Sequence, residues 1–120
     1  LAASISSIRE IFPGRKLTAI FQPHLYTRTR DFAAGFAQAL SLADRVVLLD
    51  IYPARELPIE GVDSNLILKD ISVPQKMLLH KEELLDWVEK DTQADVVVSF
   101  GAGDIDRLVE PIAEIYRKRI

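Results

Sequence analysis

The chain has 120 residues, of which 48% are hydrophobic and 28% charged, which is enough for one domain with a substantial core. It has no cysteine, which excludes a disulfide scaffold, a zinc–thiolate site and a cysteine nucleophile. The net charge of −3 provides no general attraction to nucleic acid or to an anionic membrane. No secretory signal or membrane-spanning stretch is recognisable, so we expect a cytoplasmic protein. Because the first residue is Leu1 rather than Met, we also expect a piece of a longer polypeptide.

Apolar periodicity predicts helices and strands that alternate along the chain. In chain order these are a helix over 1–12, a strand over 17–21, a helix over 29–42, a strand over 46–49, a weaker helix over 63–71, a strand over 76–79, a helix over 82–90, a strand over 95–100 and a helix over 105–115. Pro111 lies inside the last helix and should kink it or remove a hydrogen bond. This alternation predicts one α/β domain with a mostly parallel sheet that is covered by helices on both faces.

Three polar clusters follow predicted strands, and in open α/β sheets ligands bind beyond the carboxyl ends of the strands. They span residues 22–31, 50–56 and 101–104. The connections at the other edge, such as residues 42–45, carry no comparable functional groups. This asymmetry predicts a binding site at the carboxyl-terminal edge of the sheet.

The first cluster has the highest density of functional groups. His24, Tyr26, Arg28 and Arg30 lie within seven residues, just before a predicted helix. Backbone N–H groups at a helix N-terminus favour an anion, and guanidinium groups recognise carboxylate or phosphate. His24 can donate a hydrogen bond to developing negative charge. The alternative is that both arginines are merely solvated and Tyr26 only packs.

The other two clusters leave a functional and a structural interpretation open. Asp50 could bind a ribose hydroxyl or a cation and Arg55 an anion, but Asp50 could equally cap a turn and Tyr52 only close the loop. Gly101 and Gly103 begin like a dinucleotide fingerprint that lacks its third glycine. We expect these glycines to let the backbone turn tightly near a ligand or a neighbouring domain, although a purely structural turn explains them equally well.

Several catalytic motifs are missing from the sequence. It contains neither the G-x-x-x-x-G-K-[ST] phosphate loop nor a G-x-S-x-G nucleophile turn. Its two histidines are too isolated for a metal site, and we expect His80 to be exposed rather than functional. The residues alone therefore predict a binding domain with an anion-oriented site, no metal and no complete catalytic apparatus.

The run FQPHLYTRTRD at residues 21–31 resembles the signature of the C-terminal domain of the Mur ligases. Residues 50–62 and GAGDI at residues 101–105 agree with that family in order and spacing, so the resemblance covers essentially the whole chain. The first motif is highly specific, whereas the glycine-rich one is weak by itself. The likeness is greatest to the branch that joins L-alanine to UDP-N-acetylmuramate.

This resemblance implies that residues 1–120 form the Rossmann-like C-terminal domain of a three-domain cytoplasmic enzyme of peptidoglycan synthesis. The UDP-sugar-binding domain and the central ATPase domain, on which this domain would pack, would lie outside the chain. ATP, with Mg²⁺ held mainly by the central domain, would convert the muramoyl carboxylate to an acyl phosphate, which the L-alanine amine attacks. The chain alone would be inactive and would bind neither nucleic acid nor a membrane.

The resemblance also assigns site residues. His24 and Arg28 would face the closed active site and hold the alanine carboxylate and nucleotide or phosphate charge. Leu25 departs from the pattern, because many relatives have a basic residue there, and Arg30 could replace its contact. The remaining candidates at this cleft are Tyr26, Asp50, Tyr52 and Glu56, with Gly101 and Gly103 turning the backbone nearby. A Mur-type ligase for another amino acid and a non-catalytic α/β binding module remain the alternatives.

Overall fold

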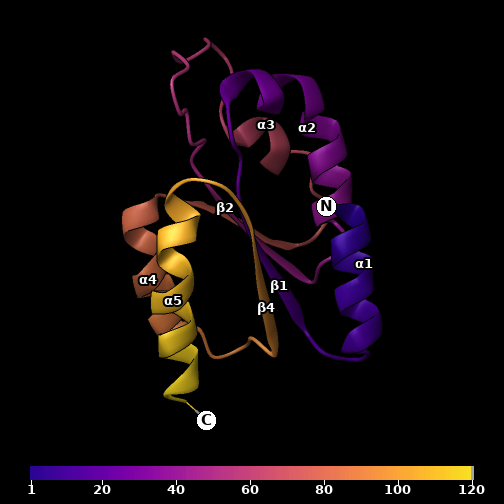
Figure 1. Ribbon diagram of the computed structural model, residues 1–120. Helices are drawn as coiled ribbons and strands as arrows, with labels where there is room; N and C mark the ends of the chain where they lie inside the picture. The colour runs from indigo at the N-terminus through magenta and orange to yellow at the C-terminus, as the bar shows by residue number, and fades with distance from the viewer. Residues whose placement is uncertain (120) are drawn as a thin grey trace.

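Four parallel strands form the centre of the computed structural model, which describes residues 1–119 (Figure 1). The strands are β1 (Leu17–Gln22), β2 (Arg45–Leu49), β3 (Gln75–Leu79) and β4 (Val96–Gly101). The helices are α1 (Ala2–Ile11), α2 (Tyr26–Leu40), α3 (Asn65–Leu68), α4 (Lys81–Lys90) and α5 (Asp104–Arg117). The sheet has the order β3-β2-β1-β4, and every pairing is parallel. The predicted α/β class with a parallel sheet is confirmed.

β1 and β2 form the interior of the sheet, and every residue of both strands is buried. Successive side chains point to opposite faces of a strand. Ala19 and Phe21 therefore join the core beneath α1, α2 and α3, whereas Ile20 joins the core beneath α4 and α5. Figure 1 shows these two groups of helices on opposite sides of the sheet. Burial on both faces explains why these strands are continuous apolar runs in the sequence.

Two helices, α2 and α3, depart furthest from their predicted bounds. α2 begins at Tyr26, three residues before the expected start, and its first turn is closed by the Thr29 N–H, which donates to the Leu25 carbonyl at 3.1 Å. Leu25 itself has a φ of 72°, a conformation that periodicity does not reveal. α3 retains only four residues of the predicted helix over 63–71. The prediction was wrong here because local turns and tertiary contacts override weak periodicity.

Pro111 does not end α5, which continues to Arg117. Ile105 and Ile112 are buried in the core beneath α5, on either side of the proline. This packing holds both halves of the helix against the sheet even though proline lacks a backbone N–H donor.

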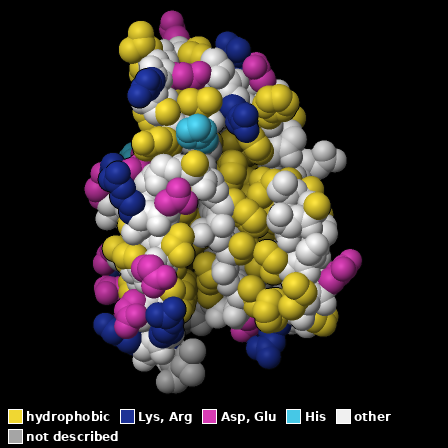
Figure 2. Space-filling view, viewed as in Figure 1, with side chains coloured by type: hydrophobic (Ala, Val, Ile, Leu, Met, Phe, Trp, Pro, Cys, Tyr) yellow, Lys and Arg dark blue, Asp and Glu magenta, His cyan; other side chains and the backbone are white. Residues whose placement is uncertain are grey.

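β4 is an edge strand, and its side chains are only partly buried. Figure 2 shows apolar side chains gathered over β4 and α1 on the viewed face. Phe100 of β4 is only partly buried, and Phe12, directly after α1, is exposed. The helices therefore cover β4 less completely than they cover the central strands β1 and β2.

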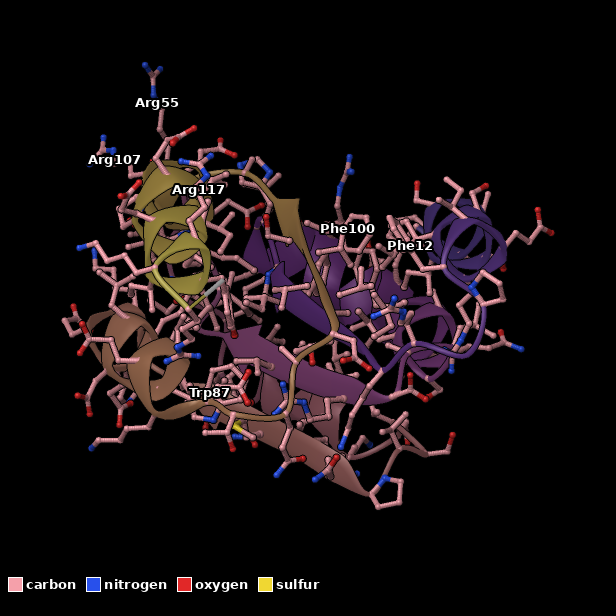
Figure 3. All side chains as sticks on the ribbon, turned by 90° about the horizontal axis from the view of Figure 1, so that it is seen from below. Phe12, Arg55, Trp87, Phe100, Arg107 and Arg117 are labelled. Carbon is pink, nitrogen blue, oxygen red and sulfur yellow. The ribbon has the colours of Figure 1, made fainter. Side chains whose placement is uncertain are left out.

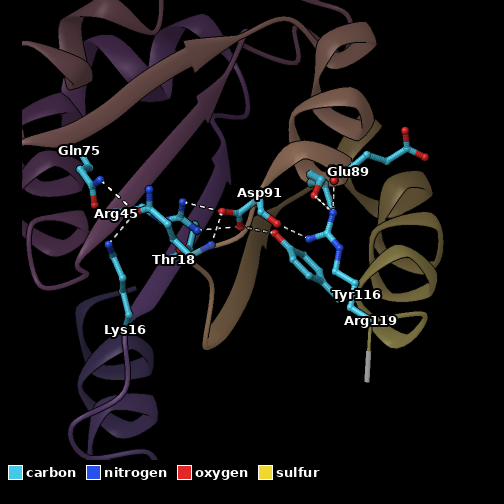
Figure 4. Close-up of polar contacts among 10 residues, drawn as sticks. Lys16, Thr18, Arg45, Gln75, Glu89, Asp91, Tyr116 and Arg119 are labelled. Atoms are coloured by element: carbon cyan, nitrogen blue, oxygen red, sulfur yellow. Dashed lines mark hydrogen bonds and ion pairs between the residues drawn. The ribbon is translucent and has the colours of Figure 1, made fainter.

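A buried ionic cluster connects α5 and the residue after α4 to the sheet at the amino-terminal ends of the strands (Figure 4). Arg45 at the start of β2 donates two hydrogen bonds to the Asp91 carboxylate, at 2.9 and 2.8 Å, and one to the Thr18 hydroxyl at 2.9 Å. The Tyr116 hydroxyl donates to the same carboxylate at 2.8 Å, and Trp87 packs against the guanidinium. Every polar side chain of this cluster is therefore hydrogen-bonded within the chain.

Candidate functional site

The candidate site lies at the carboxyl-terminal edge, where β1 and β4 end side by side with Gln22 opposite Gly101. After β1 the chain enters α2 on one face, whereas after β4 it enters α5 on the other face. Such a divergence opens the crevice in which ligands bind in open α/β sheets. The three predicted polar clusters follow β1, β2 and β4 and lie along this edge.

His24 and Tyr52 join the first two clusters. Their rings stack with centroids 5.8 Å apart and planes inclined by 16°. A short parallel bridge supports the stack, because the Leu25 N–H donates to the Tyr52 carbonyl at 2.9 Å and the Tyr52 N–H to the Pro23 carbonyl at 2.8 Å. These backbone bonds therefore hold His24 and Tyr52 side by side, although the two residues are 28 positions apart in the chain (52 − 24).

Glu56 occupies the N-terminus of α2. Its carboxylate accepts hydrogen bonds from the Thr27 hydroxyl at 2.6 Å and from the Thr27 N–H at 3.1 Å. The hydroxyl and the backbone N–H groups of Thr27 and Tyr26 hold the pKa of Glu56 below its usual value. The sequence predicted an external anion at this helix end, but the chain's own carboxylate lies there. Glu56 thus caps the N-terminus of α2 from the loop after β2.

The two arginines of the first motif differ in their bonding. Arg30 donates to Asp31 at 2.9 Å, which raises the pKa of Arg30 and lowers that of Asp31. Arg28 is exposed and makes no side-chain hydrogen bond or ion pair with any of residues 1–119. Arg55, in the loop after β2, is exposed and extends away from the body of the molecule in Figure 3. Arg28 and Arg55 are therefore the cations of these clusters that a ligand can bind without displacing a partner.

A second group of polar side chains follows the carboxyl-terminal ends of β2 and β3. The Asp50 carboxylate pairs with the His80 Nδ1 atom, and this hydrogen bond raises the pKa of His80. At the adjacent helix ends, the Lys81 ammonium donates to Asp104 at 3.3 Å. His80 is exposed, as predicted, but it is bonded to a candidate site residue that the sequence did not link to it.

Gly101 and Gly103 form a turn that other residues would not fit. A Cβ atom at Gly101 would lie 2.5 Å from the Gln22 carbonyl oxygen, and one at Gly103 would lie 2.3 Å from the Tyr52 ring. Both glycines also have positive φ angles, of 128° and 97°. The turn therefore packs directly against the residue that stacks on His24.

Gln22 is a site-edge residue that the sequence analysis did not select. It is buried, with 1% of its surface exposed, yet it lies in a strand of otherwise mostly apolar residues. Its amide nitrogen donates to the Asp50 carbonyl at 3.2 Å and to the Asp104 carboxylate at 3.1 Å, and its amide oxygen accepts from the Ile105 N–H at 2.9 Å. The available signal was an amide directly after the predicted apolar strand over 17–21, since such a group needs partners once it is buried.

A groove of about 570 Å³ between β4 and α5 lies away from this edge. Its polar lining includes Asp91, Tyr116 and Arg119. The Tyr116 hydroxyl donates to the Asp91 carboxylate, and the Arg119 guanidinium donates to the carbonyls of Asp91 and Val88 (Figure 4). The carboxyl-terminal edge, and not this groove, is the candidate site, because unpaired cations and clustered polar groups occur there. Within residues 1–119, no cluster of three acidic or histidine side chains could hold a metal ion, and no helix has the length and apolar composition to cross a membrane.

Comparison with known proteins finds close sequence relatives. The chain matches no protein-family model. It is 58% identical over all 120 residues to a UDP-N-acetylmuramate–L-alanine ligase of Parabacteroides distasonis, and 56% identical over 114 residues to one of Porphyromonas gingivalis. These matches cover 100% and 95% of the chain but only 26% and 25% of the relatives. The chain thus spans about a quarter of the length of the curated relatives that it matches.

A solved structure agrees with the sequence relatives. The UDP-N-acetylmuramate–alanine ligase of Thermotoga maritima superimposes with a TM-score of 0.70 and 26% identity, covering 99% of this chain and 24% of that enzyme. The resemblance to the Mur ligases noted from the motifs is confirmed. Across its whole length and in its fold, the chain is a homologue of one segment of the UDP-N-acetylmuramate–L-alanine ligases.

Proposed function

We propose that this chain is the C-terminal domain of an ATP-dependent ligase that joins L-alanine to UDP-N-acetylmuramate in peptidoglycan synthesis. The observation that carries the proposal is the 58% identity, over the whole chain, to an enzyme of that name. The parts that bind the UDP-sugar and ATP would lie in the remaining three quarters of the longer polypeptide, and this domain would pack on the ATP-binding part. Two of the proposed substrates, ATP and UDP-N-acetylmuramate, are nucleotides, which supports a cytoplasmic location.

The proposed reaction passes through anionic species. The muramoyl carboxylate attacks the γ-phosphorus of ATP and displaces ADP, which leaves an acyl phosphate. The alanine amine then bonds to the acyl carbon, the bond to the phosphate oxygen breaks, and the amine nitrogen loses its proton. Fixed donors and cations accelerate such steps because they orient the nucleophile and stabilise developing negative charge.

We assign the anion-binding roles to His24 and Arg28. Arg28 is exposed and has no partner among residues 1–119, so its guanidinium is available to the alanine carboxylate or to a phosphate. His24 is held by its stack on Tyr52, which limits the directions in which its ring can donate. Mg²⁺ would neutralise phosphate charge when bound, but residues 1–119 supply no cluster for it, so its ligands would come from the rest of the polypeptide.

The test is phosphate release by the full-length polypeptide with ATP, Mg²⁺ and UDP-N-acetylmuramate, with and without L-alanine. We expect release that depends on L-alanine and that falls sharply in His24→Ala. Glycine, L-serine and D-glutamate serve as competing amino acids. Release stimulated only by another amino acid would make the protein a different Mur-type ligase, and release without any amino-acid dependence would contradict the assignment.

A further inference from the structure

We propose that Gln22 is a positioning residue that sets the His24 ring through the turn at residues 101–104 and Tyr52. The inference rests on the proposed function, because it assigns Gln22 a role in the same reaction. Gln22 itself faces no ligand, since only 1% of its surface is exposed.

The Gln22 amide uses both of its ends at the point where β1 and β4 separate. The N-cap residue of α5 is Gly103, which has no side chain to cap the helix. The Gln22 amide oxygen supplies that cap from the neighbouring strand, because it accepts from the Ile105 N–H at 2.9 Å. The amide nitrogen holds the Asp104 carboxylate at 3.1 Å, so two consecutive residues of α5 are attached to β1.

The same amide nitrogen also bonds to the loop that follows β2. It donates to the Asp50 carbonyl at 3.2 Å, two residues before Tyr52. Gln22 thus connects both segments that enclose the Tyr52 ring, namely the loop that carries it and the turn that packs against it. Because each of these hydrogen bonds is buried or partly buried, removing one leaves a polar group without a partner.

The connection from the turn to His24 is a short series of contacts. Gly103 packs so closely on Tyr52 that a Cβ atom there would lie 2.3 to 2.6 Å from three ring atoms. Tyr52 in turn stacks on His24, with ring centroids 5.8 Å apart. A shift of the turn therefore moves the Tyr52 ring, and the His24 ring with it.

The first experiment is a double-mutant cycle in the full-length polypeptide with Gln22→Glu and His24→Ala. The Gln22→Glu change keeps the length of the side chain, removes its N–H donors and places a carboxylate beside Asp104. We expect kcat/KM for L-alanine to fall by about tenfold or more in Gln22→Glu, a loss of roughly 1.4 kcal/mol. If Gln22 acts through His24, the same substitution has little further effect in the His24→Ala background.

The matched control is Gln38→Glu, the same chemical change at an exposed position of α2, which should leave kcat/KM unchanged. Losses that simply add in the double variant, or an unchanged kcat/KM in Gln22→Glu, would overturn the inference. Gln22→Asn is the second variant, since it keeps the amide but shortens its reach. Failure of both variants to fold would show that the role is structural only.

A second measurement separates this inference from the proposed function. The imidazole NMR signals of His24, assigned by their loss in His24→Ala, should shift in Gln22→Glu and not in Gln38→Glu. Phosphate release that is independent of L-alanine in the wild type would contradict the proposed function whatever the Gln22 variants do. An unshifted His24 signal in Gln22→Glu would contradict the positioning role even in an active ligase.

Discussion

At Gly103 the missing side chain is what allows the turn after β4 to approach Tyr52. The φ of 97° is one that residues with a Cβ atom rarely adopt, and the ring atoms occupy the space that a Cβ atom would need. Arg28, by contrast, has no hydrogen-bond or ion-pair partner for its side chain among residues 1–119. These two residues allow separate tests of the packing and of the charge of the site.

We expect Gly103→Ala to destabilise the chain by roughly 2–4 kcal/mol, because it adds backbone strain and a steric clash with Tyr52. The control is Gly35→Ala, which lies within α2, has no atom near its Cβ position and should stabilise the chain by about 0.5–1 kcal/mol. Urea unfolding of the wild type and both variants measures the changes in the free energy of unfolding. Equal effects of the two substitutions would show that the turn does not press against the ring.

For Arg28→Ala in the full-length polypeptide, we expect KM for L-alanine or for ATP to rise roughly 10- to 100-fold, the equivalent of one charge-assisted hydrogen bond. Unfolding free energy should change by no more than about 0.5 kcal/mol, because the side chain is exposed. Arg117→Ala, which removes an exposed arginine paired with Glu114, is the control. Unchanged kinetics would remove Arg28 from the site.

Among the elements, α5 is bonded to the sheet at the carboxyl-terminal ends of the strands, and the residue after α4 is bonded to it at their amino-terminal ends. At the carboxyl-terminal edge Gln22 of β1 bonds to α5, and the Lys81–Asp104 pair joins α4 to α5. At the amino-terminal edge it is through Asp91, which receives hydrogen bonds from Arg45 and Tyr116. Burial acts to raise the pKa of Asp91, but these hydrogen bonds outweigh it and lower the pKa to about 2.

This depressed pKa predicts acid sensitivity. Its ordinary value is 3.8, so the ionised carboxylate stabilises the fold above about pH 4, and this stabilisation, about 2 kcal/mol, is lost as the pH falls toward 2. Asp91→Asn should unfold more easily at pH 7 and lose less stability than the wild type between pH 5 and 2.5. Asp86→Asn, which removes an exposed pair with Lys90, should keep the wild-type slope in urea-unfolding series.

For the whole molecule, the proposed domain organisation predicts that the 120-residue chain folds alone but has no catalytic activity. Its sequence carries no G-x-x-x-x-G-K-[ST] phosphate-binding loop. Purified chain should show a cooperative unfolding transition and no phosphate release from ATP above a buffer blank. Robust ATP hydrolysis by the chain would show that it contains an ATP site that the sequence and the fold did not reveal.

Sequence periodicity predicted the order and type of the helices and strands, including the short strand over 76–79, which the structure has as Gln75–Leu79, because short apolar runs and helical apolar patterns are local. It failed at the start of α2 and over α3. The positive φ of Leu25 and the hydrogen bonds that Thr27 donates to Glu56 decide where α2 begins, and Glu56 lies 29 positions away from Thr27. Periodicity within a window cannot detect a partner at that distance.

The sequence by itself determined the α/β class, the edge of the sheet that carries the polar clusters and the motif that leads to the Mur ligases. Only the tertiary structure decided which of those polar groups are free and which are bonded within the chain. Glu56 closes the α2 N-terminus, Arg30 is paired and Arg28 is not, and Gln22 reaches α5 across 83 residues. The physical reason is that parallel strand order brings distant loops to one edge, and side-chain bonding depends on that contact rather than on neighbours in the chain.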